Sequence, residues 1–321
     1  MRVKTHASPL PPEDSMADAL PKNILDDPGA DNTNLIEATQ IMARNIRRYA
    51  LIGIHHAGSG HPGGSLSCAD MLACLGTGEL QGYGPDVPDT DRDRLILSKG
   101  HAAPALYGLG VEAGFLKAAD MATLRQLGSP LQGHPHVGAL PWVETSTGSL
   151  GQGASVAVGM ALGLRHQDNT HRVYAVLGDG ELQEGQIWEA AMGAAHYQLS
   201  NLCFLIDYNK LQSDAPNAEI MGLEPLTDKW RAFGWHTQIL DGHVITDLYA
   251  ALNQARAETE KPSVLICNTV KGKGVSYMEH APEWHGSVKL TDAQTAAALE
   301  GLGLGHTDRL AWLKGEIHGS A

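Results

Sequence analysis

The chain has 321 residues, of which 43% are hydrophobic, so it is long enough to bury a large core as a globular protein. Its 23 basic and 36 acidic residues give a formal net charge of −13, which argues against a surface for nucleic acid or anionic membrane. The sequence lacks a run of 18 apolar residues and the apolar stretch of a secretory signal, so we expect a cytoplasmic protein without a membrane span. The 4 cysteines fall in apolar patterns without Cys-x-x-Cys spacing, which predicts buried thiols.

The first part of the chain changes from an irregular segment to a helical pattern. Residues 1–33 carry several prolines and acidic residues without periodicity, which predicts a disordered or surface-draped arm. Asn34 and Glu37 have the spacing of a capping box, and the apolar residues after them recur at helical spacing to about His55. A long helix is therefore predicted here, ending before a glycine-rich break at 58–64.

Alternating strand and helix patterns fill the rest of the chain. Short apolar runs predict strands at 94–97, 173–177 and 201–206, and further strands, each preceded by a helical pattern, are predicted at 236–240 and 263–269. Helical patterns occur at 66–75, from about 154, at 181–197 and at 246–256. This alternation predicts an α/β fold with a mostly parallel sheet flanked by helices. Residues 34–290 are expected to form one domain, followed by a short helical tail at 291–321.

The most informative feature lies at two strand ends. Gly178-Asp179-Gly180 follows the strand at 173–177, and Asn209 follows the next strand, 30 residues after Asp179. Parallel strands end at the same edge of a sheet, so Asp179 and Asn209 should lie side by side. A carboxylate, a carboxamide oxygen and a backbone carbonyl just beyond Asn209 suit Mg²⁺ or Ca²⁺, with a diphosphate supplying further oxygens. The glycines let a phosphate approach the backbone, although Gly-Asp-Gly by itself is more often a surface turn.

Residues 178–209 resemble the motif of thiamine-diphosphate enzymes, and the wording Gly-Asp-Gly-Glu-Leu-Gln-Glu-Gly is similar to that of transketolases. The resemblance implies the cofactors thiamine diphosphate and Mg²⁺ or Ca²⁺, held by Asp179, Asn209 and the carbonyl of Leu211. Tyr208 departs from the many thiamine enzymes that have a second Asn at this position. That position is not a metal ligand, so the departure leaves the expected metal site unchanged.

Four of the 16 histidines lie in glycine-containing loops: His61, His101, His134 and His285. Each alone is more often a surface or core residue, but together they could exchange protons near pH 7 or bind phosphate and hydroxyl groups. Their segments resemble those of transketolase in the same order, as does 269–276, and the resemblance covers roughly residues 35–290. It implies that the four histidines line the channel to the thiazolium carbon of the cofactor, with His101 also in the cofactor site. No role is assigned to four other histidines, most of which are expected to be structural or solvent-facing: His55, His56, His136 and His196.

The resemblance implies further site residues. Gly148 and Leu150, in the loop at 147–153, would contact the cofactor together with Gly178 and Gly180. Glu184 is similar to the family's glutamate that connects the cofactor sites across the dimer, and otherwise is a first-turn helix acid favoured by the helix dipole. Two lysines, Lys271 and Lys273, have two open interpretations: they contact phosphate, or they lie in a solvated turn.

Nothing after residue 290 resembles the pyrimidine-binding domain of a full-length transketolase. The chain therefore resembles the N-terminal, diphosphate-binding subunit of a split transketolase, which transfers a two-carbon ketol unit from a ketose to an aldehyde. The implied partner is a C-terminal subunit with the pyrimidine-binding domain, in a heterotetramer with two copies of each subunit, and the implied substrate is a sugar or sugar phosphate. Two alternatives remain open: another thiamine-diphosphate reaction such as decarboxylating ketol synthesis, and a non-catalytic diphosphate-binding module.

Overall fold

The structure is a computed structural model that describes residues 32–213 and 215–319, so the predicted arm at 1–33 lies almost wholly outside the described residues. Within these ranges five strands form one sheet in the order β1-β2-β3-β5-β4, and every neighbouring pair is parallel. The strands are β1 (Arg94–Leu97), β2 (Val173–Gly178), β3 (Leu202–Tyr208), β4 (His236–Asp241) and β5 (Ser263–Asn268). The predicted parallel α/β sheet is confirmed.

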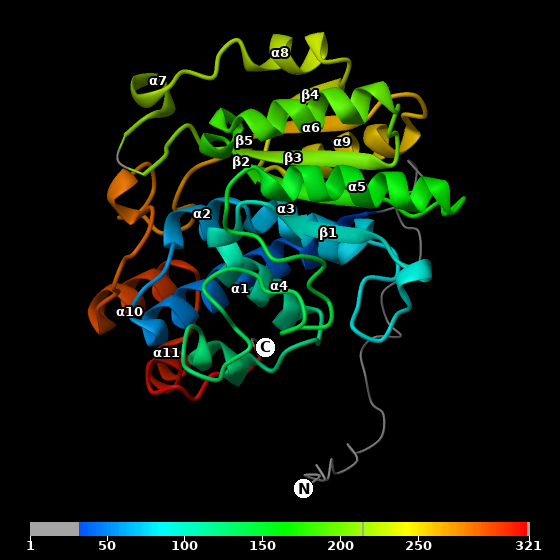
Figure 1. Ribbon diagram of the computed structural model, residues 1–321. Helices are drawn as coiled ribbons and strands as arrows, with labels where there is room; N and C mark the ends of the chain where they lie inside the picture. Colours follow the sequence, from blue (N-terminus) through cyan, green and yellow to red (C-terminus); the bar gives the residue numbers. More distant parts are fainter. Residues whose placement is uncertain (1–31, 214, 320–321) are drawn as a thin grey trace, which may run out of the picture.

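Helices cover both faces of the sheet, which makes three layers (Figure 1). One face packs against α5 (Gln152–His166), α6 (Gly185–His196) and α8 (Leu226–Ala232). On the side of the other face lies a larger group: α1 (Thr33–Ala57), α2 (Pro62–Ser67), α3 (Ala69–Cys74), α4 (Ala103–Glu112) and α9 (Ile245–Ala257), with α10 (Asp292–Gly301) and α11 (His306–Leu313) packed on α1. The short helix α7 (Asn217–Ile220) lies in the connection between β3 and α8.

Strands β1, β2, β3 and β5 are mostly apolar because both of their faces are buried, whereas the edge strand β4 is more polar and partly exposed. In β2, Val173, Ala175 and Leu177 face the α5–α6 side, whereas Tyr174 and Val176 face the α1 side. Successive side chains of a strand point to opposite faces, so a strand covered on both sides needs an apolar residue at nearly every position. The four cysteines are buried free thiols, as predicted.

Three local predictions were wrong in detail. Helix α1 begins at Thr33, so Asn34 is already helical, and the N-cap residue Asn32 makes no side-chain cap hydrogen bond. The predicted helix at 66–75 begins earlier, at Pro62, and is interrupted at Cys68 between α2 and α3. The predicted helix at 181–197 starts as a 3₁₀ turn, and because Glu184 is extended (ψ 129°), α6 begins anew at Gly185.

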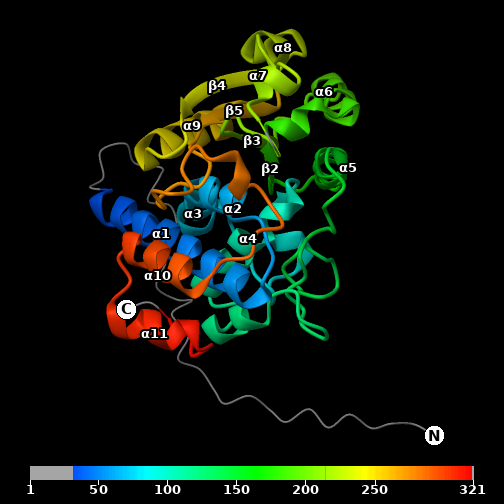
Figure 2. The ribbon, with the colours of Figure 1, turned by 90° about the vertical axis from the view of Figure 1, so that its left-hand side faces the viewer.

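The two helices at the end of the chain pack against α1 (Figure 2). Trp312 of α11 is buried and stacks on Tyr49 of α1 with ring centroids 5.3 Å apart. Arg48 donates two hydrogen bonds to the carbonyl of Leu302, at 2.8 and 3.1 Å. The ring of His56 bonds to the carbonyl of Trp312 at 2.8 Å, and that of His55 bonds to the Thr295 hydroxyl at 3.0 Å. These two histidines are therefore structural, as expected, and His136 and His196 are exposed.

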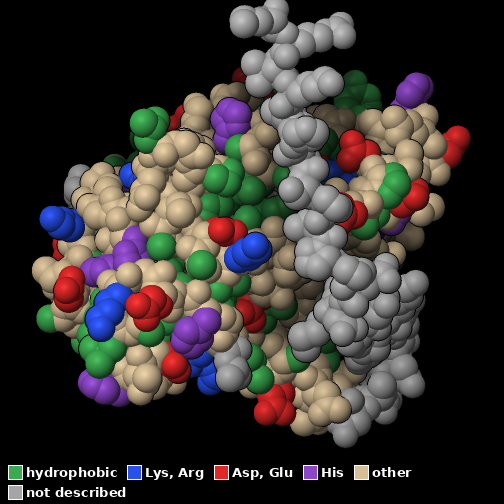
Figure 3. Space-filling view, turned by 90° about the horizontal axis from the view of Figure 1, so that it is seen from below, with side chains coloured by type: hydrophobic (Ala, Val, Ile, Leu, Met, Phe, Trp, Pro, Cys, Tyr) green, Lys and Arg blue, Asp and Glu red, His purple; other side chains and the backbone are tan. Residues whose placement is uncertain are grey.

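One face of the molecule agrees with the acidic balance of the sequence (Figure 3). On the uncovered part of the face in Figure 3, Lys and Arg side chains lie singly among acidic and histidine side chains, without a basic stripe. None of the helices in the described ranges combines the length and apolar character needed to cross a membrane.

Candidate active site

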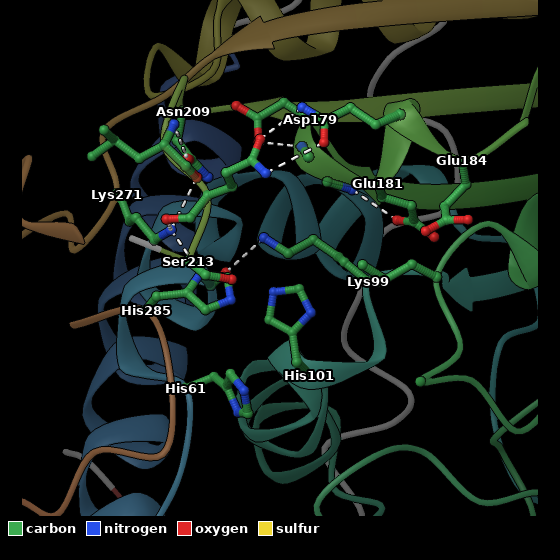
Figure 4. Close-up of a pocket in the computed structure, with 18 of the residues that line it drawn as sticks. His61, Lys99, His101, Asp179, Glu181, Glu184, Asn209, Ser213, Lys271 and His285 are labelled. Carbon is green, nitrogen blue, oxygen red and sulfur yellow. Dashed lines mark hydrogen bonds between the residues drawn. The ribbon is translucent and has the colours of Figure 1, made fainter. Parts of the chain in front are cut away.

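A cavity of about 400 Å³ lies at the edge of the sheet where the strands end. Since the strands are parallel, the segments that follow β1, β2, β3 and β5 converge on this edge. Lys99, Asp179, Asn209 and Lys271 follow these strands and line the cavity (Figure 4). The sheet topology therefore brings together side chains from across the sequence.

Every residue predicted for the site lines this cavity. The set comprises His61, His101, His134, His285, Glu184, Gly148, Leu150, Gly178, Gly180, Asp179, Asn209 and Leu211. Further lining residues that the sequence analysis did not select as site residues are Gly64, Lys99, Glu181, Gln183, Gln212 and Ser213.

Asp179 and Asn209 lie on touching loops, as the strand order requires. Asp179 accepts hydrogen bonds from the backbone amides of Gly180, at 2.8 Å, and Lys210. The side-chain oxygen of Asn209 accepts from the Leu211 amide at 3.1 Å. Burial, reinforced by the neighbouring carboxylate of Asp207, raises the pKa of Asp179 to about 7. A carboxylate in this environment favours a cation beside it.

The described residues contain no cluster of three or more His, Cys, Asp or Glu side chains suited to a metal ion. A cation in this cavity would therefore depend on one carboxylate, one carboxamide oxygen and backbone carbonyls. Those are the donor types that Mg²⁺ and Ca²⁺ accept, particularly when phosphate oxygens complete the coordination.

Lys99, which lines the cavity, forms a buried ion pair with Asp207. The sequence analysis did not predict this pair. The side chain of Asp207 is 0% exposed and accepts hydrogen bonds from Lys99 and from the hydroxyls of Ser67 and Thr269. Although burial opposes ionisation of both groups, each holds the other charged: the pKa of Asp207 is lowered and that of Lys99 is raised. A single carboxylate inside the apolar run of β3 was the available signal, because a buried charge requires a partner.

Glu181 joins the loops around the cavity. Its carboxylate accepts from the amides of Gly151 and Gly178, each at 2.9 Å, and from the hydroxyl of Ser98. Glu184 differs in being exposed at the rim of the cavity, where it is the N-cap residue of α6 and makes no side-chain cap hydrogen bond. The carboxylate of Glu181 is therefore occupied by hydrogen bonds within the fold, whereas that of Glu184 is accessible to solvent.

The four loop histidines form one cluster around His61. The centroid of the His61 ring lies 5.3 Å from that of His101, 5.8 Å from that of His285 and 6.5 Å from that of His134. Burial is the main cause that lowers the pKa of His61 to about 4 and that of His285 to about 3, and it holds that of His101 well below the usual value. These three rings are consequently neutral at pH 7 and can accept a proton.

A glycine makes the close contact with His61 possible. A Cβ atom on Gly286 would lie 2.2 Å from Cδ2 of His61, which is far inside van der Waals contact. The Trp284-His285-Gly286 segment can therefore approach the cluster because its third residue has no side chain.

Lys271 is buried in the cavity wall, so the solvated-turn interpretation is wrong for this residue. Its ammonium group donates to the carbonyls of Leu211, at 2.9 Å, and Gln212, at 3.3 Å, and lies 2.7 Å from Nδ1 of His285. Burial lowers the pKa of Lys271 to about 8. When the ammonium group donates to Nδ1 of the neutral His285, the ring proton is on Nε2; when Lys271 is the neutral amine, Nδ1–H donates to it and Nε2 is free to accept.

Comparison with known proteins agrees with this geometry. Residues 38–311 match the family described as "Transketolase, thiamine diphosphate binding domain". The chain is 44% identical over 262 residues to the 6-deoxy-6-sulfo-D-fructose transketolase subunit SqwG of Clostridium sp. (strain MSTE9), covering 81% of this chain and 94% of that protein. It is 38% identical over 266 residues to a subunit of the apulose-4-phosphate transketolase of Phocaeicola vulgatus, covering 83% of this chain and 94% of that protein.

Longer transketolases match over part of their length. Human transketolase is 39% identical over 252 residues, which cover 78% of this chain and 40% of the human protein. The crystal structure of transketolase from Campylobacter jejuni superposes with a TM-score of 0.78 at 30% identity, covering 88% of this chain and 47% of that one. This chain thus spans about half the length of the solved transketolase. It belongs to the transketolase family, as a subunit that carries the family's thiamine diphosphate-binding domain.

Proposed function

We propose that this chain, with a separate subunit that carries a pyrimidine-binding domain, transfers a two-carbon ketol unit from a ketose donor to an aldehyde acceptor. The observation that carries the proposal is that oxygen donors for a metal-bound diphosphate and a cluster of neutral histidines line the same cavity. Two relatives that the chain covers almost completely are themselves named as subunits, which supports a partner. The proposed assembly is a heterotetramer with two copies of each subunit.

The cofactor site is proposed to use the oxygens of Asp179, Asn209 and the Leu211 carbonyl to hold Mg²⁺ or Ca²⁺ beside the diphosphate. The buried carboxylate of Asp179 supports this fit, because its contacts are backbone amides and not a cationic side chain. Gly178 and Gly180 leave the backbone open to phosphate, and Gly148 and Leu150 line the same cavity. When bound, thiamine diphosphate supplies the electron sink for breaking and making the carbon–carbon bond.

The histidine cluster is proposed to move protons to and from the sugar hydroxyls. His61 is central in the cluster, and its Nδ1 atom is buried without a hydrogen-bond partner among the described residues. His285 is held by Lys271 through Nδ1, so its other ring nitrogen is oriented by that contact. His61 could take the proton of a donor hydroxyl. His285 could do so through Nε2 in the tautomer whose Nδ1–H donates to the neutral amine of Lys271. His101 and His134 would complete the polar lining. Glu184, accessible at the rim, is proposed to connect cofactor sites across the assembly.

The substrate is proposed to be a small sugar or sugar phosphate. The two subunit relatives are named for a sulfonated and a phosphorylated sugar, so anionic sugars are the first donors to test. The cytoplasmic location expected from the sequence remains part of the proposal.

A reconstitution assay tests the function. The purified chain is assayed with thiamine diphosphate, Mg²⁺ and ketose donors, alone and after addition of candidate partners that carry a pyrimidine-binding domain. We expect turnover in the mixture and none from the chain alone. Robust turnover without a partner would contradict the two-subunit proposal, whereas assembly and cofactor binding without turnover would favour the non-catalytic module.

A further inference from the structure

His243 lies outside the cavity lining but contacts the segment that carries Lys271 into it. It follows β4, and its side chain is 12% exposed. Its Nε2 atom lies 2.8 Å from the backbone nitrogen of Val270, and its Nδ1 atom lies 2.7 Å from Oδ2 of Asp70. Val270 is the residue immediately before Lys271.

The partners of His243 determine its tautomer. A backbone amide can only donate, so Nε2 accepts from Val270 and carries no proton. The proton of the neutral ring is then on Nδ1, which donates to the Asp70 carboxylate. A ring held on both nitrogens has its orientation set, as in the carboxylate–histidine pairs that orient ligands in metal sites.

Asp70 is itself held by α1. Arg47 donates to both carboxylate oxygens of Asp70 and, through Nε, to the carbonyl of Leu66 at 3.1 Å. Burial opposes ionisation of Asp70, but Arg47 and His243 together keep its pKa below the usual value. The chain of contacts from Arg47 through Asp70 and His243 therefore ends on the amide of Val270.

The ammonium group of Lys271 is buried and donates to backbone carbonyls, so these hydrogen bonds form only when the backbone at Lys271 is correctly placed. No ion pair found among the described residues involves Lys271. Its neighbours are fixed from two other sides: the Thr269 hydroxyl donates to Asp207, and the Gly272 amide donates to the Gly63 carbonyl at 3.1 Å. A shift at Val270 would move the ammonium group off the Leu211 carbonyl and off Nδ1 of His285. Figure 4 shows Lys271 directed toward His285.

We propose that His243 is a positioning residue, which acts through the Val270 amide to hold Lys271 between the Leu211 carbonyl and Nδ1 of His285. The contacts of His243 with Asp70 and Val270 do not involve a ligand. The inference rests on the proposed function only because a diphosphate is chosen as the probe for binding.

The first test measures binding of magnesium pyrophosphate to the full chain by calorimetry. His243→Leu keeps the bulk but removes both ring nitrogens, and we expect it to weaken binding by about 10- to 100-fold, the range typical of residues that orient ligands. His243→Gln, whose amide oxygen can accept from Val270, should bind close to wild type. The matched control is His236→Leu, at the opposite end of β4, where the ring contacts Ser263 and not the cavity. Binding in His243→Leu equal to that in His236→Leu would overturn the proposal.

A double-mutant cycle with Lys271→Met separates positioning from general stability. If His243 acts through Lys271, His243→Leu should have little further effect on pyrophosphate affinity in the Lys271→Met background. Fully additive losses would overturn the proposal, because a structural role does not need Lys271.

Two ligand-free measurements keep the inference distinct from the proposed function. In His243→Leu, we expect faster hydrogen exchange at the Val270 amide and faster acylation of Lys271 by acetic anhydride, with both restored in His243→Gln. Unchanged exchange and acylation in His243→Leu would overturn the positioning role. If the wild-type chain fails to bind magnesium pyrophosphate, the proposed cofactor site is wrong, and these two measurements still decide the role of His243.

Discussion

At the scale of single residues, three buried carboxylates around the cavity are satisfied in three different ways. Asp207 is paired with Lys99, and Glu181 accepts from two amides and a hydroxyl. Asp179 has two amide contacts, and its pKa is raised to about 7. Asp179 is therefore the carboxylate with the most to gain from a bound cation, since a buried charge is stabilised by an opposite charge close to it.

Asp179→Ala is expected to abolish metal-dependent binding of thiamine diphosphate, because a hard cation would lose its anionic protein ligand. Asn209→Ala, which removes a neutral oxygen, should weaken binding less. Calorimetry on the assembled complex with Mg²⁺ measures both affinities, and Asp247→Ala, an exposed carboxylate on α9, is the control. Unchanged affinity in Asp179→Ala would reduce the Gly-Asp-Gly segment to an ordinary turn.

His285→Ala is expected to leave cofactor binding intact and to lower kcat/KM by about 10²- to 10⁴-fold, as for the loss of a general base. Single-turnover cleavage of the donor, on complexes of verified stoichiometry, separates chemistry from assembly. The exposed His136→Ala serves as control. An unaltered cleavage rate in His285→Ala would remove this residue from the mechanism, although the metal site would stand.

At the scale of elements, helix boundaries depend on contacts that local propensity does not describe. Helix α2 contains Gly63 and Gly64, which weaken an isolated helix, yet both are buried against side chains of the cavity. A Cβ atom on Gly63 would lie 2.9 Å from the backbone oxygen of Trp284, so the close packing of α2 on the site favours glycine there. The position of α2 therefore depends on packing against the residues of the cavity.

Packing of α11 on α1 gives a stability prediction. Trp312→Ala should lower the free energy of unfolding by about 3 kcal/mol, the lower end of the range for Trp→Ala. We expect the lower end because the indole Nε1 of Trp312 is buried without a hydrogen-bond partner in the described structure. Urea denaturation measures the change, and Leu310→Ala, 48% exposed on the same helix, should stay within about 0.5 kcal/mol of wild type. Equal effects of the two variants would contradict the observed packing of α11.

At the scale of the whole molecule, the site lies where the helices on both faces of the sheet meet the edge at which its strands end. Its histidines come from loops next to α2 and α4 and from the segment after β5. Burying several neutral rings together makes the stability of the fold depend on pH.

The histidine cluster should destabilise the fold as the solution becomes acidic. The folded pKa values of His61 and His285, about 4 and about 3, lie below the usual value of 6.5. At pH values between the folded and the unfolded pKa of each ring, the unfolded chain binds more protons than the folded chain. The stabilisation that comes from the neutral rings is therefore full above pH ~6.5 and is lost as the pH falls toward ~4. Asp179, with its raised pKa, acts in the opposite direction.

Comparing wild type with a His61→Asn, His285→Asn variant isolates the histidine contribution, because both proteins keep the carboxylates. Between pH 7.5 and pH 5, wild type is expected to lose more of its free energy of unfolding than the variant, as measured by urea denaturation. Equal losses would show that the two rings titrate as they do in an unfolded chain.

The sequence by itself determined the sheet and the convergence of the site. Apolar runs locate buried strands because a strand covered on both faces needs apolar residues at nearly every position, and neighbouring parallel strands end at a common edge. Asp179 and Asn209 therefore had to meet, and the glycine-flanked histidines were recognisable from their resemblance to transketolase segments. These features depend on short-range patterns and on a general rule of topology.

The tertiary structure decided how charges are paired and where helices begin. The Lys99–Asp207 pair, the three contacts of Glu181, the burial of Lys271 and its support by His243 join residues from separate segments. No local pattern specifies such partners, because a hydrogen bond or ion pair depends on distance in space and on desolvation. From the sequence alone, the same polar residue could equally well be exposed to solvent. The break between α2 and α3 has the same origin, since packing against the site outweighs helix propensities of a few tenths to about 1 kcal/mol.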